Sequence, residues 1–232
     1  MSAVKPAPPL DPAVEVARVK EDVAVGNEIV RHKLSSRVIH WVVAATFFLC
    51  LFTGMPIWTP VFGWMAHFFG GLSVCRVVHP WIGLAFFASS AVMMVDWHAQ
   101  MTLDRSQKGW WGPRLLRYLK WELEDENVGK YNEGQKFYFW TVGLGALGVI
   151  ASGLIMWFPA WFPGIVRQLA FVLHDVTFIL FAVAVVFHIY LSTSAEPGTF
   201  GSMTRGTVTR KWARLHHPRW YREVTGEDPR RR

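Results

Sequence analysis

The sequence predicts an all-α integral membrane protein whose four spans form a helix bundle. Of the 232 residues, 52% are hydrophobic and 18% are charged, a smaller charged share than the roughly 25% of a soluble domain. Four apolar stretches are each long enough to cross a bilayer core of about 30 Å as a helix. The basic residues collect mainly outside these stretches, as they do around membrane spans.

The four predicted spans cover residues 36–57, 77–97, 137–158 and 165–193. Blocks of Lys and Arg lie before the first span, between the second and third, and after the fourth. The positive-inside rule therefore predicts that both termini are cytoplasmic. This distribution favours membrane orientation over nucleic-acid binding as the reason for the net charge of +7. The first apolar run begins too late and is too long for a cleavable signal.

Composition divides the chain into three parts. Residues 1–30 mix Pro and Gly with charges of both signs and are expected to form a mobile cytoplasmic arm. Residues 31–204 contain the four spans. Residues 205–232 are rich in Arg and are expected to form a basic cytoplasmic tail.

Four of the nine histidines fall inside the predicted spans, where ionisable residues are rare and functional by default. His174 and His188 share the fourth span, and their spacing of fourteen residues gives roughly 21 Å of rise and just under four helical turns. They therefore face nearly the same way at opposite depths. His40 lies at the depth of His188 and His79 at the depth of His174, which predicts two pairs.

Two histidines from different helices suit the axial positions of a haem, which supplies four pyrrole nitrogens itself. Zinc requires three or four protein ligands at each site. A haem with two axial histidines has no open position and suits electron transfer. We expect His40 with His188 to hold a haem near the cytoplasm, and His79 with His174 to hold an outer one. The alternative is a haem-free anchor or transporter whose histidines only bond neighbouring carbonyls or hydroxyls.

Arginine precedes two of these histidines by three residues, in Arg37-Val-Ile-His40 and Arg76-Val-Val-His79. Each Arg would lie on the histidine's side of its helix, nearer to water. Its planar donor fork suits a haem propionate, although an interfacial Arg can also simply snorkel. Gly54, fourteen residues beyond His40, is expected to leave room for the outer macrocycle.

The remaining five histidines lie in predicted loops or tails, where we expect them to be solvated: His32, His67, His98, His216 and His217.

With these residues placed, the chain resembles the membrane cytochrome b (gamma) subunit of respiratory formate dehydrogenase from about Arg31 to Glu223. The loop around Tyr131 and the segment Trp212–Tyr221 are more specific than the histidines alone. The resemblance implies a four-helix bundle with two b-type haems and the pairing given above. The segments that carry it are Arg37–Trp41, Arg76–Gly83, Val128–Lys136, His174, His188–Tyr190 and Arg210–Arg222.

The resemblance also implies a quinone, either menaquinone or ubiquinone, bound near the cytoplasmic haem against Asn132, Gly134 and Gln135. It implies an iron–sulfur (beta) subunit and a molybdenum- or tungsten-containing catalytic (alpha) subunit as partners, and the bacterial inner membrane as the location. This chain would transfer electrons and reduce quinone without itself oxidising formate, in a complex that can form a higher oligomer. A cytochrome b subunit of a membrane hydrogenase is the nearest alternative.

Overall fold

A computed structural model of the chain describes residues 11–102 and 128–230. The chain divides into two compact units, and each is described by itself. The bundle unit comprises residues 38–102 and 133–191 of the described chain. The terminal unit comprises residues 11–37, 128–132 and 192–230.

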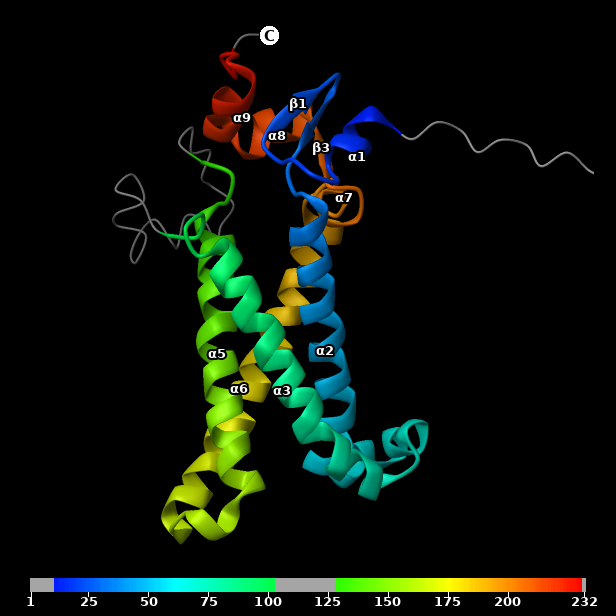
Figure 1. Cartoon of the computed structure of the whole chain (residues 1–232), viewed down its shortest axis with the longest axis vertical. Helices are drawn as coiled ribbons and strands as arrows, with labels where there is room; N and C mark the ends of the chain where they lie inside the picture. The colour runs from blue at the N-terminus through cyan, green and yellow to red at the C-terminus, as the bar shows by residue number, and fades with distance from the viewer. Residues whose placement is uncertain (1–10, 103–127, 231–232) are drawn as a thin grey trace, which may run out of the picture. The chain divides into compact units, whose positions relative to one another are not determined.

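Four long helices build the bundle unit (Figure 1). All four are long and apolar enough to cross a membrane, which confirms the predicted spans. All four begin earlier than the predicted spans, and two of them begin four or five residues earlier, at Leu72 and Glu133, because polar residues can occupy a first helical turn at the interface. The helices are α2 (Leu34–Trp58), α3 (Leu72–Trp97), α5 (Glu133–Trp157) and α6 (Gly164–Tyr190), the last continuing as the π-helical turn η5 (Leu191–Ala195).

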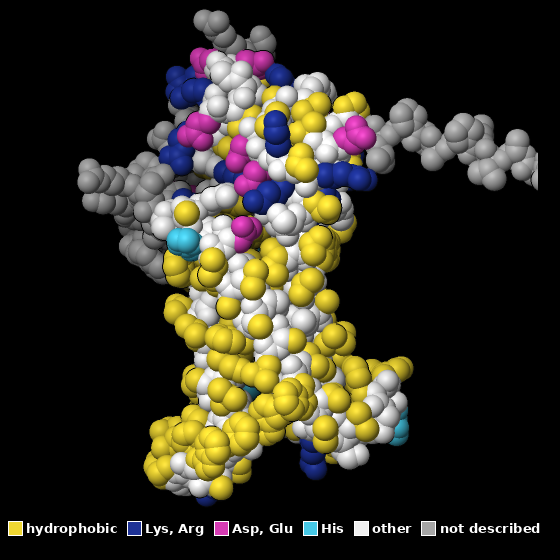
Figure 2. All heavy atoms as spheres, viewed as in Figure 1, with side chains coloured by type: hydrophobic (Ala, Val, Ile, Leu, Met, Phe, Trp, Pro, Cys, Tyr) yellow, Lys and Arg dark blue, Asp and Glu magenta, His cyan; other side chains and the backbone are white. Residues whose placement is uncertain are grey.

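The outer surfaces of these helices are apolar. Hydrophobic side chains cover much of their visible face (Figure 2). Val95, Leu144 and Val186 are 74%, 66% and 67% exposed. Water would penalise so many exposed aliphatic side chains, whereas lipid accommodates them. The observed surface is therefore that of a bundle embedded in a bilayer.

Short aromatic segments close the bundle at the ends of the helices. The segment η1 (Pro60–Phe69) joins α2 to α3, and η4 (Pro159–Trp161) joins α5 to α6. Gly70 and Gly71 have φ values of 88° and 112°, which reverse the chain into α3 at positions where a side chain would be strained.

The terminal unit contains a three-stranded antiparallel sheet that the sequence analysis did not predict. Its strands are β1 (Val23–Val25), β2 (Glu28–Val30) and β3 (Thr207–Thr209), in the order β1-β2-β3. In the register of the last pair, Ile29 lies opposite Val208. The short helices of the unit are α1 (Pro12–Val16), α7 (Gly201–Thr204), α8 (Arg210–His216) and α9 (Pro218–Thr225).

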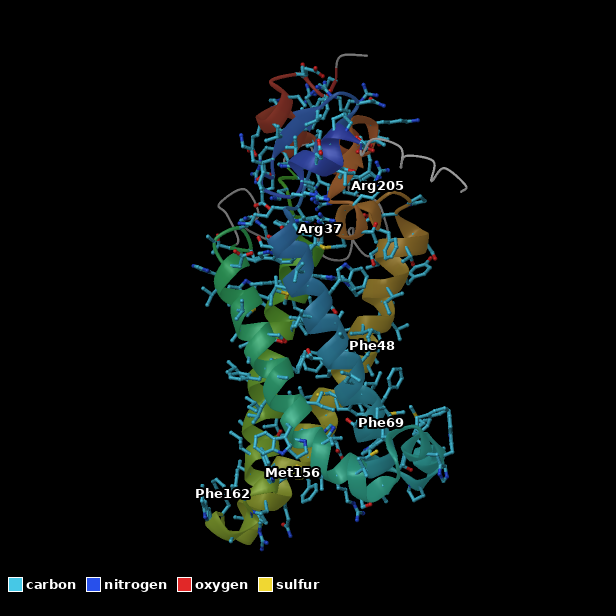
Figure 3. All side chains as sticks on the ribbon, turned by 45° about the vertical axis from the view of Figure 1, so that its right-hand side comes forward. Arg37, Phe48, Phe69, Met156, Phe162 and Arg205 are labelled. Atoms are coloured by element: carbon cyan, nitrogen blue, oxygen red, sulfur yellow. The ribbon has the colours of Figure 1, made fainter. Side chains whose placement is uncertain are left out.

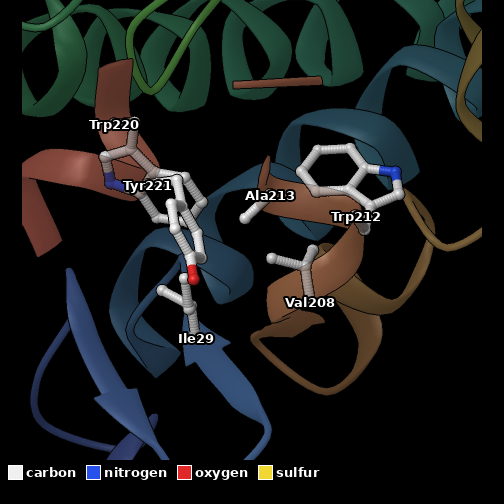
Figure 4. Close-up of a cluster of buried hydrophobic side chains, with 6 residues drawn as sticks. All are labelled: Ile29, Val208, Trp212, Ala213, Trp220 and Tyr221. Carbon is white, nitrogen blue, oxygen red and sulfur yellow. The ribbon is translucent and has the colours of Figure 1, made fainter. Parts of the chain in front are cut away.

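A small hydrophobic core joins the two ends of the chain in this unit. Side chains from β2, β3, α8 and α9 are buried against one another (Figure 4), namely Ile29, Val208, Trp212, Ala213, Trp220 and Tyr221. The expected boundaries differ from this arrangement, because residues 11–30 of the expected arm and residues 207–225 of the expected tail share one sheet and one core. Residues 1–10 of that arm lie outside the described residues.

The side chain of Arg31 is buried in the terminal unit. The guanidinium of Arg31 is packed over the rings of Trp212, Tyr131 and Trp220, at 4.9, 5.6 and 5.7 Å from their centroids. Its Nη2 donates a hydrogen bond of 2.6 Å to the carbonyl oxygen of Lys130. Burial lowers the pKa of Arg31 to about 10, so the side chain remains charged at neutral pH and is stabilised by the aromatic faces.

Two histidines expected to be solvated are buried in this unit. His32 is 2% exposed and His217 is fully buried. The Nδ1–H of His217 donates to the carbonyl oxygen of Gly129 at 2.6 Å. Burial, together with the positive charge of Arg31, holds the pKa of His217 well below its ordinary value of 6.5. The expectation was wrong for these two because the tail that carries His217 folds into a core, whereas His67, His98 and His216 are exposed as expected.

Candidate functional site: two histidine pairs

The bundle unit brings the four intramembrane histidines together as two pairs. His40 on α2 faces His188 on α6, with ring centroids 6.2 Å apart and the ring planes at 45°. His79 on α3 faces His174 on α6, with centroids 6.3 Å apart and the planes at 71°. These are the partners that matching depth predicts. Figure 3 labels two residues of α2, Arg37 near the start of the helix and Phe48 further along it.

The distances in both pairs suit a single metal atom between the rings. A metal–imidazole nitrogen bond measures about 2.0 Å, and the ring centroid lies roughly 1.1 Å behind the nitrogen, so two rings on opposite sides of one atom have centroids about 6.2 Å apart. Each pair matches this value within 0.1 Å. Two axial nitrogens are what a haem iron needs from the protein, so the residues present fit the group.

A hydroxyl group contacts one ring nitrogen of each histidine in the outer pair. Thr53 Oγ1 lies 3.1 Å from Nδ1 of His79, and Ser152 Oγ lies 2.9 Å from Nδ1 of His174. Both Thr53 and Ser152 are completely buried. The second nitrogen of each ring, Nε2, therefore remains for a ligand bond.

Each outer histidine lies against a glycine, and the approach is close only at Gly54. A Cβ on Gly54 would lie 3.0 Å from Cε1 of His79, and one on Gly153 would lie 3.6 Å from Cε1 of His174. Gly54 was expected to leave room for a macrocycle. The atoms next to it are those of the His79 ring, which approaches α2 closely there, and the role toward the macrocycle stays a prediction.

Aromatic rings surround the inner pair. The phenol ring of Tyr138 on α5 stacks on His188, with centroids 4.5 Å apart and an interplanar angle of 4°. The indole of Trp41 meets His40 edge-on at 5.2 Å. Stacking of this kind restricts rotation of the imidazole, so it orients the two rings of the pair.

An aromatic layer separates the two pairs. Phe47, Phe86 and Phe181 touch one another, and each of the three ring-centroid distances is 5.9 Å. Sequence analysis missed this layer, although a signal existed: each phenylalanine lies seven residues, or nearly two helical turns, from a histidine of its own helix. Phe47 follows His40, Phe86 follows His79 and Phe181 follows His174 by seven residues. All three rings therefore lie at one depth, between the two pairs.

Comparison with known proteins agrees with this geometry. The family of prokaryotic cytochrome b561 matches residues 31–206. The chain belongs to the prokaryotic cytochrome b561 family. Its membership implies a b-type haem, and the four apolar helices make it a multi-pass membrane protein.

Three relatives extend the similarity over nearly the whole chain. The cytochrome b556 subunit of formate dehydrogenase from Haemophilus influenzae is 32% identical over 88% of this chain and 87% of its own. The cytochrome b556(fdo) subunit of formate dehydrogenase from Escherichia coli K12 is 34% identical, with coverage of 85% and 94%. The nitrate-inducible Fdn subunit of the same strain is 33% identical, with coverage of 84% and 91%. These relatives support the resemblance drawn from the sequence.

The two arginines expected near haem propionates differ in their surroundings. Arg37 is 8% exposed, and its Nη1 donates a hydrogen bond of 2.8 Å to the carbonyl oxygen of Thr204 within the terminal unit. Arg76 is exposed on the second turn of α3, one turn before His79. The propionate role of both residues stays a prediction for this cytochrome b561.

The residues expected to bind quinone lie where α5 begins. Asn132 immediately precedes the helix, and Gly134 and Gln135 belong to its first turn. The predicted third span began at residue 137, whereas the helix begins at Glu133 and so includes Gly134 and Gln135. In the same helix, Gln135 lies three residues before Tyr138, which stacks on His188.

Proposed function

We propose that this chain is the dihaem cytochrome b subunit of a membrane-bound formate dehydrogenase and conducts electrons across the membrane to a quinone. The observation that carries this proposal is the duplicated histidine pair. α6 contributes one member of each pair, fourteen residues apart, and α2 and α3 contribute the others. When bound, two haems b would supply one-electron carriers at two membrane depths.

The protein's own part in this process is to hold and insulate the carriers. His40 and His188 would hold the inner haem b, and His79 and His174 the outer one. The phenylalanine layer lies between the pairs, and the rise of roughly 21 Å along α6 would set the separation of the two haems. Electrons would thus enter at the outer face and leave at the inner face.

The direction follows from the proposed orientation in the membrane. The basic blocks favour cytoplasmic termini and the bacterial inner membrane as the location. Negative charge that moves inward, combined with proton uptake from the cytoplasm, stores about 2.3 kcal/mol per charge per 100 mV of membrane potential. The chain would therefore contribute to charging the membrane.

We propose the quinone site at the start of α5, against Asn132, Gly134 and Gln135. Amide side chains supply hydrogen-bond donors for the quinone carbonyl oxygens, and a glycine lets the ring approach the backbone. Tyr138 links this turn of α5 to the inner histidine pair through its stacking on His188. Either menaquinone or ubiquinone has the required pair of carbonyls.

The proposed partners are an iron–sulfur subunit and a molybdenum- or tungsten-containing catalytic subunit that oxidises formate. The relatives are named as subunits of formate dehydrogenase, which supports this assignment. Co-purification of the chain with these subunits, rather than with a hydrogenase, tests it directly.

Substitution of single histidines tests the pairing. We expect His40→Ala and His188→Ala to remove the same spectral component in a redox titration and to leave the other component reducible. His174→Ala should remove the opposite component. If His40→Ala and His174→Ala removed the same component, the pairing and the electron path built on it would both be wrong.

A further inference from the structure

The outer histidine pair is held by hydrogen bonds whose direction can be read from the geometry. Thr53 Oγ1 donates its only hydrogen to the carbonyl oxygen of Leu49, at 2.7 Å, in the manner of a buried helical threonine. Its contact with Nδ1 of His79 at 3.1 Å must therefore use an oxygen lone pair. The Nδ1 of His79 is the donor.

The opposite histidine repeats this arrangement from another helix. Ser152 Oγ donates to the carbonyl oxygen of Gly148 at 2.7 Å, and it lies 2.9 Å from Nδ1 of His174. The proton of His174 is thus also fixed on Nδ1. Both rings of the outer pair present a deprotonated Nε2, the form that binds a metal.

The inner pair does not share this pattern at His40. Among the residues that the structure describes, Nδ1 of His40 is buried and has no hydrogen-bond partner. The indole of Trp41 meets the ring of His40 edge-on, and the phenol ring of Tyr138 stacks on His188. His40 therefore differs from both outer histidines, whose Nδ1 atoms each contact a hydroxyl group, even though the ring separations of the two pairs are nearly equal.

We infer that Thr53 and Ser152 are positioning residues that fix the tautomer of the outer histidines and lower the reduction potential of the outer haem relative to the inner one. This inference rests on the proposed dihaem function. A hydroxyl that accepts from Nδ1–H raises the basicity of the ligand at Nε2. A more basic ligand stabilises ferric over ferrous iron, so the potential falls. A lower outer potential is the order that inward electron flow requires.

The test uses the purified complex with its haems. Potentiometric titration measures the midpoint potential of each haem, and electron paramagnetic resonance of the ferric state measures its ligand field. We expect Thr53→Val and Ser152→Ala each to shift the outer midpoint potential to a more positive value and to change the outer g values. The inner potential should not move. The outer component is identified as the one that His174→Ala removes.

Two further variants separate the hydroxyl from simple packing. Thr46 provides a matched control on the same helix, because its Oγ1 also donates to the carbonyl of the fourth preceding residue, Val42, at 2.8 Å, and its side-chain partner is Ser89 rather than a histidine. Thr46→Val should leave both potentials at the wild-type values. Thr53→Ser keeps the acceptor oxygen and should also behave as wild type.

Each outcome decides the inference. A positive shift of the outer potential, or loss of the outer haem, in Thr53→Val but not in Thr53→Ser or Thr46→Val supports it. Unchanged outer potential and g values in both Thr53→Val and Ser152→Ala would overturn it, as would an equal effect of Thr46→Val or Thr53→Ser. If the wild-type chain binds no haem, the proposed function fails. If it binds two haems and the variants change nothing, only this inference fails.

Discussion

Replacing Gly145 with alanine is expected to destabilise the bundle by crowding the aromatic layer between the two histidine pairs. A Cβ at this position would lie 2.6 Å from Cζ of Phe181 and 2.9 Å from its Cε1. Carbon atoms pack best at about 3.5–4.0 Å, so the overlap is close to 1 Å. Phe181 is 5% exposed and is flanked by Phe47 and Phe86, which limit its retreat.

The magnitude is the balance of two opposing effects. Overpacking of a filled core costs about 1–3 kcal/mol. Replacing glycine by alanine in a helix stabilises it by roughly 0.5–1 kcal/mol. The central values of the two ranges are about 2 and about 0.75 kcal/mol, so we expect Gly145→Ala to lower the free energy of unfolding by about 1 kcal/mol.

Gly83 in α3 provides the matched control, because nothing lies within 4 Å of a Cβ built there. Gly83→Ala should raise the free energy of unfolding by the helix-propensity gain alone, about 0.5–1 kcal/mol. The assay is unfolding in mixed micelles with increasing sodium dodecyl sulfate, followed by far-ultraviolet circular dichroism. A Gly145→Ala variant as stable as wild type, or a Gly83→Ala variant equally destabilised, would refute the packing of this layer.

Two further predictions concern the terminal unit and the quinone site. Burial depresses the pKa of His217 below 6.5 in the folded state, so the unfolded state binds the proton more tightly. The terminal unit should therefore lose up to about 1.4 kcal/mol of stability for each pH unit below 6.5, until the folded histidine titrates. Amide hydrogen exchange of β3 between pH 7.5 and 5.5 measures this loss, which His217→Gln should reduce; equal pH sensitivity in that variant would exclude His217 as the cause. Asn132→Ala and Gln135→Ala should each slow quinone reduction and weaken quinone-site inhibitors while both haems stay bound and reducible; unchanged quinone kinetics and inhibitor affinity, or loss of haem, would move the site elsewhere.

The membrane helices were predictable from sequence because their signals are local. A run of apolar residues determines a span wherever it occurs, and α-helical rise alone sets the relative depths of His174 and His188. Matched depth then selected the partners His40 and His79 without any knowledge of helix packing. The same geometry places Phe181 halfway between the two histidines of α6, a regularity that is already present in the sequence.

The terminal unit was not predictable because its order depends on contacts between distant residues. Strands of three residues are too short for a clear alternating pattern, and Ile29 pairs with Val208 across most of the chain's length. From the sequence, Arg31 is indistinguishable from the other residues of its basic block, although in the structure it is buried among aromatic rings. The contacts of the Thr53 and Ser152 hydroxyls with histidines were equally unpredictable, because the sequence does not indicate which side chain a small polar residue in a span contacts.

The haem content of the purified chain tests the central claim most directly. A pyridine haemochrome assay, calibrated against protein concentration, should give two haems b per chain, as the two histidine pairs with centroids 6.2 and 6.3 Å apart require. The double variant His79→Ala with His174→Ala should give one. A wild-type chain that carries one haem or none, in the intact complex, would contradict the account.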